Sequence, residues 1–137
     1  MINSVPILKD SRLKIFKTKH FAKWSKKTGL NDDNLMKSVT EIENGLVDAV
    51  LGGNLIKKRI AINKNKRGGG RVIVAYKHGN KVFFLFGFEK NDSDNISKNE
   101  LAALKIVGNT LLTASEQELL KLLSSGELVI IGGKTNV

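Results

Sequence analysis

Hydrophobic spacing in the first third of the chain predicts a short strand followed by two amphipathic helices. Residues 14–16 have β-strand character, and residues 18–28 place apolar side chains three to four positions apart before Gly29 ends the segment. A second helix begins at Asp32 or Asp33, since carboxylates suit a first helical turn. Its apolar face is formed by Leu35, Val39, Ile42 and Leu46.

In the middle of the chain the hydrophobic period changes to two, which predicts β-strands. Residues 55–62 put isoleucines on one face and Lys57 and Arg59 on the other. Lys58 falls on the apolar face by parity, so we expect it to lie near a sheet edge or to extend its amine to solvent.

Two more strands follow, at residues 71–77 and 81–88, joined by a tight hairpin turn. The second is apolar on both faces, which is typical of a central strand. Simple alternation predicts one face with Phe84, Phe86 and Phe88, and an opposite face with Phe83, Leu85 and Gly87.

Two capping boxes predict helices in the last third of the chain. Ser97 with Glu100, and Ser115 with Glu118, have the spacing that satisfies the first N–H groups of a helix. Residues 128–131 can add a short strand. The resulting order of elements predicts an α+β fold: a small, mostly antiparallel β-sheet with helices packed on it.

Length and composition favour one soluble domain. The chain has 137 residues, which is too short for two ordinary domains. We expect residues 1–13 to be a poorly ordered lead-in and residues 14–137 to form the domain. No secretory segment or membrane-length apolar run is present, so we expect a cytoplasmic protein. With no cysteine and two histidines, the chain offers no thiolate nucleophile and little material for a metal site.

The positive charge is concentrated in one segment. The net charge is +10, and residues 51–90 hold ten Lys or Arg against a single acidic residue. Such a segment is typical of a protein that binds a polyanion, most often nucleic acid. A basic surface that serves only solubility is the plainer alternative.

Seven of these ten basic residues are expected to converge at one end of the sheet if the three strands are neighbours. They are Lys57, Arg59, Lys64, Lys66, Arg67, Arg71 and Lys90. Converging cations suit a phosphodiester, because they neutralise charge that builds in the transition state. Like charges also lower the pKa of a member lysine, which can then accept a proton from a ribose 2′-hydroxyl. Glu89 is the one carboxylate nearby, so we expect metal-free and cofactor-free chemistry, or phosphate binding without turnover.

Other candidate motifs have simpler interpretations. The acidic residues between 92 and 100 lack the glycine and the spacing of a calcium loop. The glycines at 68–70 precede a strand and lack the Gly-Lys-Ser/Thr of a phosphate loop. His20 and His78 are interpreted as structural or solvated residues rather than catalytic ones.

From residue 14 to about residue 123 the chain resembles the RelE/HigB-type toxins of bacterial type II toxin–antitoxin modules, in the RelE/ParE superfamily. The segments that carry the resemblance are 51–61, 66–76, 86–91 and 97–112. The resemblance implies a compact microbial-ribonuclease-like α+β fold. It also implies a ribosome-dependent endoribonuclease, or mRNA interferase, in which the 2′-hydroxyl attacks the adjacent phosphate.

The resemblance also implies roles for individual residues. Lys57 is expected to accept the proton, and Arg59 to hold the phosphate. Arg71 matches an arginine that stabilises the scissile phosphate, and Lys90 matches a basic residue at the end of the last strand. Further RNA contacts are expected from Lys58, Lys64, Lys66, Arg67 and Asn91. Some relatives have an arginine where this chain has Asn91, and a tyrosine where it has Asn95 and Ile96, so the general acid and base-stacking partner stay unassigned.

The expected partners are mRNA, the decoding site of the ribosome and a cognate antitoxin, a small helix-turn-helix DNA-binding protein; no membrane is expected. Two alternatives remain open. A ParE-like toxin poisons DNA gyrase by binding, although such relatives usually lack this dense basic set. A non-catalytic RNA- or ribosome-binding domain would show salt-sensitive binding without cut ends.

Overall fold

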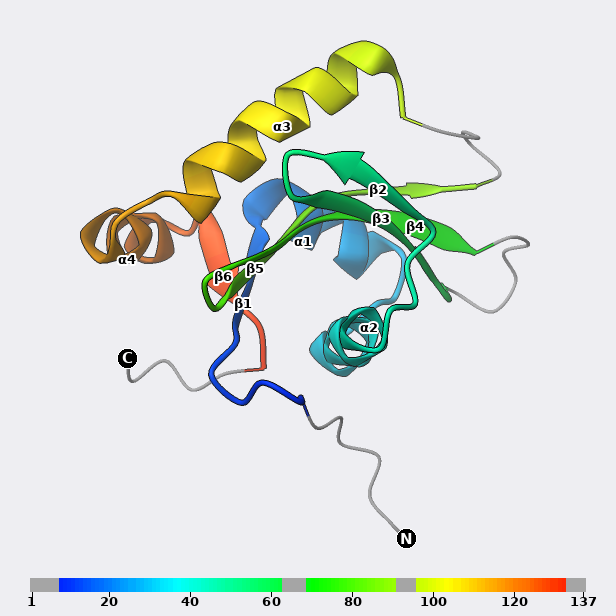
Figure 1. Ribbon diagram of the computed structural model, residues 1–137, viewed down its shortest axis with the longest axis horizontal. Helices are drawn as coiled ribbons and strands as arrows, with labels where there is room; N and C mark the ends of the chain where they lie inside the picture. The colour runs from blue at the N-terminus through cyan, green and yellow to red at the C-terminus, as the bar shows by residue number, and fades with distance from the viewer. Residues whose placement is uncertain (1–7, 63–68, 91–95, 133–137) are drawn as a thin grey trace, which may run out of the picture.

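The computed structural model describes residues 8–62, 69–90 and 96–132. In these residues a six-stranded sheet has helices on both faces (Figure 1). In chain order the elements are β1 (Lys14–Thr18), α1 (Lys19–Lys27), α2 (Asp32–Glu43), β2 (Ala49–Gly52), β3 (Leu55–Ile60), β4 (Gly70–His78), β5 (Lys81–Glu89), α3 (Lys98–Leu112), α4 (Glu116–Ser125) and β6 (Leu128–Ile130). The predicted α+β fold is confirmed.

The strand order is β2-β3-β4-β5-β1-β6. All neighbouring strands are antiparallel except β1 and β5, which run parallel. The sheet is therefore mixed but mostly antiparallel, as expected. The parallel pair has a consequence for the site, because it brings the N-terminus of α1 beside β5.

Local sequence signals account for the helix boundaries. Thr18 and Asn31 cap α1 and α2, and both predicted capping boxes are present at the starts of α3 and α4. Gly126 ends α4 with φ of +83°, a conformation that favours glycine. These interactions satisfy backbone N–H groups that otherwise lack partners at a helix N-terminus.

Each face of the sheet has its own apolar core. The face covered by α1 and α2 buries residues such as Leu35, Val72 and Phe84, and the face covered by α3 and α4 buries others such as Leu55 and Ile73. In Figure 1, α2 and α3 lie on opposite sides of the sheet. On each side of the sheet, a glycine allows a close contact between a helix and a strand.

Glycines at two positions allow helices to approach the strands closely. A Cβ on Gly87 would lie 2.3 Å from the ring of Trp24, which packs directly on β5. A Cβ on Gly108 of α3 would lie 3.0 Å from the side chain of Leu55 in β3. Both contacts therefore depend on the missing side chain.

Strand β5 contains a bulge that simple alternation did not predict. Ile73 pairs with Phe86 but Val74 pairs with Phe84, so Leu85 is an extra residue in β5. As a result Phe86 and Phe88 pack against the α3 side together with Leu85, while Phe84 packs on the opposite side. The prediction that Phe84, Phe86 and Phe88 share a face is wrong.

Two segments differ from what the sequence predicted. Strand β2 was missed, and it forms the outer strand of a hairpin whose turn includes Asn54 with φ of +65°. Residues 8–13, in the expected lead-in, are held by N–H groups of Lys9 and Asp10 that donate to the Glu43 carboxylate, each at 3.0 Å. Leu13 is buried in the core. In the described part of the chain, no helix is both long and apolar enough to cross a bilayer.

Candidate functional site

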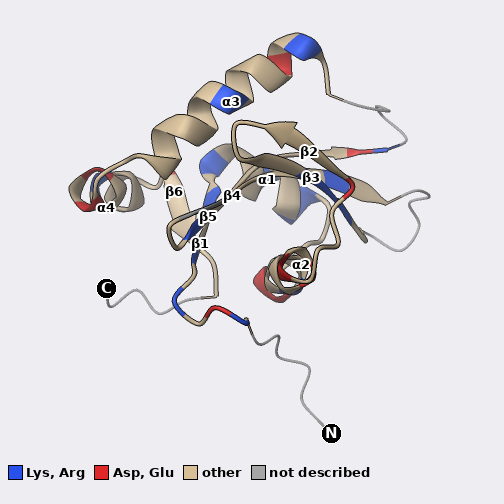
Figure 2. Cartoon of the chain, viewed as in Figure 1, with Lys and Arg blue, Asp and Glu red and all other residues tan. Residues whose placement is uncertain are grey.

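Three of the expected cations line one surface pocket at the end of the sheet. Its volume is about 350 Å³, and its lining consists of Arg59, Ile60, Ala61, Ile62, Gly69, Arg71 and Lys90. Arg59 on β3 pairs in register with Arg71 on β4, and Lys90 directly follows β5. Figure 2 shows basic positions on β3 and at the end of β5 on the same side of the molecule. Among the described residues, no carboxylate lines this basic pocket.

A backbone contact at Gly69 connects the strands that contribute to the basic pocket. The N–H of Lys90 donates to the carbonyl of Gly69 at 3.2 Å, which connects the end of β5 to the start of β4. Gly69 has φ of +63°, and a Cβ there would lie 3.0 Å from the carbonyl oxygen of Ile60. Any other residue at this position would be strained, so this part of the pocket lining requires glycine.

Arg71 is held in a fixed orientation. Its side chain is 9% exposed, and its Nε lies 3.3 Å from the Asp48 carboxylate just before β2. Its Nη1 donates to the carbonyl of Gly70 at 3.1 Å. A guanidinium held in this way can bind an anion with little loss of conformational freedom. Asp48 was not anticipated, because its contact depends on the missed strand β2.

Arg59 and Lys57 lie on the same face of β3 as each other, but their surroundings differ. Arg59 is exposed and reaches the pocket, whereas Lys57 is half-buried and is not part of the pocket lining. Lys57 pairs in register with Ile73, one row further along the face covered by α3. The structure therefore places Lys57 beside the pocket and Arg59, Arg71 and Lys90 around it.

Lys58 lies on the opposite, apolar face of the sheet, as its parity predicted, and in the strand next to the edge strand β2; the alternative that its amine extends to solvent is wrong. It is 7% exposed, and its amine lies 2.8 Å from the Glu41 carboxylate of α2. An ammonium buried under a helix needs such a partner, because an unpaired charge is costly to desolvate. Since α2 covers this face, Lys58 cannot reach RNA bound at the basic pocket.

Four further expected RNA contacts lie outside the described residues: Lys64, Lys66, Arg67 and Asn91. The same is true of Asn95, while Ile96 is partly buried against the core under α3. In the described part of the chain, no group of three or more His, Asp or Glu side chains is arranged to hold a metal ion.

Comparison with known proteins identifies the family. No curated protein sequence matches the chain. The family model of the RelE toxin of the RelE / RelB toxin–antitoxin system matches residues 13–131. This range includes every helix and strand of the described residues, together with the whole basic pocket. The chain therefore belongs to the RelE toxin family, whose members act as the toxin of a toxin–antitoxin system.

Proposed function

We propose that this toxin is a metal-independent endoribonuclease that cuts mRNA on the translating ribosome. The observation that carries the proposal is the basic pocket, where Arg59, Arg71 and Lys90 converge without a lining carboxylate among the described residues. A divalent metal would need oxygen ligands at this place, whereas a phosphate needs the cations that are there. Membership of the RelE family supports a toxic activity, and the pocket favours RNA as its target.

The reaction needs no external nucleophile. The ribose 2′-oxygen attacks the adjacent phosphorus, and the bond from phosphorus to the 5′-oxygen breaks. The products are a 2′,3′-cyclic phosphate and a free 5′-hydroxyl. One proton leaves the 2′-hydroxyl and one is delivered to the departing 5′-oxygen, so the balance of atoms closes without water or metal.

The pocket residues suit distinct parts of this reaction. Negative charge builds on the non-bridging phosphate oxygens, where Arg71 is already oriented by Asp48 and Gly70. Arg59, exposed at the rim, holds the phosphate, and Lys90 adds positive charge from the end of β5. Lys57, beside the pocket on the same face, is proposed as the proton acceptor.

The proposal extends to partners and compartment. Lys64, Lys66, Arg67 and Asn91 are proposed to hold the RNA backbone of mRNA or ribosome. Because the substrate is translated mRNA, the site of action is the cytoplasm. The antitoxin is proposed to be a helix-turn-helix DNA-binding protein that neutralises the basic pocket or prevents entry into the ribosome.

Primer extension on one mRNA in a translating bacterial extract tests this function. We expect discrete new 5′ ends that require translation, and a loss of about 100-fold or more in their rate of appearance for Arg71→Ala. Lys121→Ala, an exposed cation of α4, which packs on β6 and contributes no residue to the pocket, is the matched control and should cut like wild type. Wild-type cleavage by Arg71→Ala would contradict the assigned site. Arrest of translation without new ends would indicate ribosome blocking, and unaffected translation would direct attention to gyrase.

A further inference from the structure

A pair of stacked rings lies on the same side of the sheet as the basic pocket. The imidazole of His20 stacks on Phe86 with ring centroids 5.6 Å apart and planes within 8° of parallel. His20 is exposed and Phe86 is partly exposed, so the pair is accessible from solvent. Phe88 lies behind this pair in the core, with its ring centroid 6.3 Å from that of Phe86 and its plane tilted by 44°.

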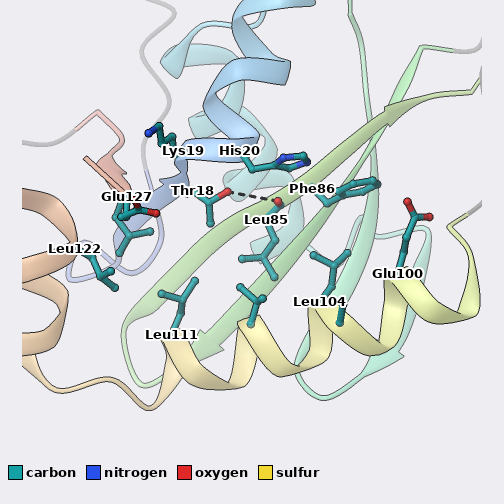
Figure 3. A pocket seen from close by; sticks show the side chains of 13 residues that line it. Thr18, Lys19, His20, Leu85, Phe86, Glu100, Leu104, Leu111, Leu122 and Glu127 are labelled. Atoms are coloured by element: carbon teal, nitrogen blue, oxygen red, sulfur yellow. Dashed lines mark hydrogen bonds between the residues drawn. The ribbon is translucent and has the colours of Figure 1, made fainter. Parts of the chain in front are cut away.

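Two features of the fold create this pair. The bulge at Leu85 turns Phe86 toward the α3 side, where regular alternation would have pointed it the other way. Thr18 caps α1 by accepting from the N–H of Phe21 at 3.0 Å, and its hydroxyl also donates to the carbonyl of Leu85 at 3.5 Å. The cap therefore connects the start of α1 to the bulge and places His20 over Phe86 (Figure 3).

The strand register relates these rings to the cations. Arg59, Arg71 and Phe88 form one row across β3, β4 and β5, and Lys57, Ile73 and Phe86 form the next. Two such rows on one face are about 7 Å apart, from about 3.4 Å per residue. An RNA strand whose phosphate binds at Arg71 therefore has to extend by one row of the sheet to reach Phe86 and His20.

A pocket opens beside the stacked rings, and its chemistry suits a flat, mostly apolar group. Its volume is about 430 Å³. Most of the lining is apolar and comes from β5 and α3, including Leu85, Leu104, Val107 and Leu111. Polar groups are supplied by Thr18, Lys19, His20, Glu100 and Glu127. In Figure 3, His20 and Glu100 stand on the α1 and α3 sides of the pocket near Phe86. A nucleobase has an apolar face for stacking and a polar edge that a carboxylate can accept from.

We infer that this pocket, the stacking pocket, binds a nucleobase next to the scissile phosphate and that His20 and Phe86 select the position of the cut. The inference rests on the proposed function. An RNA base is favoured over an apolar protein segment, because Phe86 lies one row from Arg59 and Arg71 on the same face of the sheet, and because its ring and that of His20 lie parallel.

The test compares His20→Ala with His20→Phe in two assays. In translation-dependent cleavage, His20→Ala is expected to raise KM about 5-fold or more with a smaller change in kcat, and to change which bases flank the cut. His20→Phe keeps a flat ring and should restore KM. Lys23→Ala, an exposed cation in the same helix, is the control for charge and should behave like wild type.

The second assay measures binding without chemistry, using a fluorescent single-stranded RNA with 2′-O-methyl groups that cannot be cleaved. His20→Ala should weaken binding about 5-fold or more and His20→Phe should not. Equal binding and an unchanged cut pattern for His20→Ala would overturn the inference while leaving cleavage intact. The wild type could instead fail to cut RNA while its RNA binding still depends on the ring at position 20. That result would overturn the proposed nuclease activity and support the stacking pocket. A protein partner lost on Val107→Asp, with RNA binding unaffected by His20→Ala, would reassign the pocket and also overturn the inference.

Discussion

Lys57 and Lys58 are neighbours in the sequence, yet the two faces of the sheet give them opposite surroundings. Lys58 is covered by α2 and paired with Glu41, on a side where helix packing extends to the end of the sheet: Trp24 contacts Gly70 and Gly87 there. Arg59 and Arg71 lie on the other face, and none of the residues that line the basic pocket belongs to a helix. The surroundings of a cation on this chain therefore depend on which face is covered at its position.

The two buried cations show a second difference. Glu41 pairs with Lys58, which is enclosed by the core, whereas Asp48 pairs with Arg71, which also lines the basic pocket. A phosphate bound at the pocket can compete with Asp48 for Arg71, while nothing outside the protein reaches Lys58.

Removing the carboxylate on the covered face should cost the most stability. Glu41→Ala leaves the Lys58 ammonium buried under α2 without this partner, and we expect a loss of about 3 kcal/mol in the free energy of unfolding. Lys58→Met, which replaces the charge with an apolar side chain of similar length, should be neutral or stabilising. Urea unfolding of the two variants measures both values. Equal destabilisation by both would show that the ion pair itself, rather than the uncompensated charge, supports this face.

Overpacking the same face should have the next largest effect. Gly87→Ala places a methyl group where the Trp24 ring lies, and we expect a loss of about 2 kcal/mol in the free energy of unfolding. The double variant with Trp24→Leu removes the clash, so the two substitutions should be non-additive in thermal or urea unfolding. Additive losses would contradict the direct contact.

Much of the fold follows from local sequence, but the surroundings of Lys58 do not. The Ser97 and Ser115 capping boxes, the strand period of two and the convergence of Arg59 with Arg71 all depend on short-range spacing or on hairpin register. Which side of the sheet α2 covers depends on packing between segments far apart in the chain. The burial of Lys58 depends on the same packing.

The stacked rings show the same limit more sharply. His20 was interpreted as structural or solvated, because nothing in its own segment indicates a partner. Its contact with Phe86 needs the parallel pairing of β1 with β5 and the bulge at Leu85. One extra residue in a strand reverses the face of every later side chain, and alternation alone cannot detect it.

On the uncovered face, weakening the internal partner of Arg71 should favour RNA. Asp48→Asn removes the carboxylate that competes with phosphate, so we expect about threefold tighter binding of single-stranded RNA, equivalent to about 0.7 kcal/mol. Fluorescence anisotropy at fixed salt measures the change. Weaker binding would show that Asp48 is needed chiefly to orient the guanidinium.

The smallest effect concerns pH and lies away from both cation sites. The hydrogen bonds from the Ser115 backbone and side chain lower the pKa of Glu118. Because the folded pKa is depressed, the contribution of this capping box is present above the ordinary carboxyl pKa and is lost as pH falls through the lowered value. Glu118→Gln should therefore reduce the fall in thermal stability on acidification, measured from pH 6 down to pH 3. An identical fall in both proteins would contradict the role of this carboxylate.

The most direct test of the central claim puts one substitution on each face of β3 into the same cleavage assay. Arg59→Met and Lys58→Met both exchange a long cation for the same apolar side chain, one position apart. The account predicts that Arg59→Met lowers the rate of translation-dependent mRNA cleavage by about 10-fold or more, while Lys58→Met cuts at the wild-type rate. Full activity of Arg59→Met, or a comparable loss from Lys58→Met in a folded protein, would contradict it.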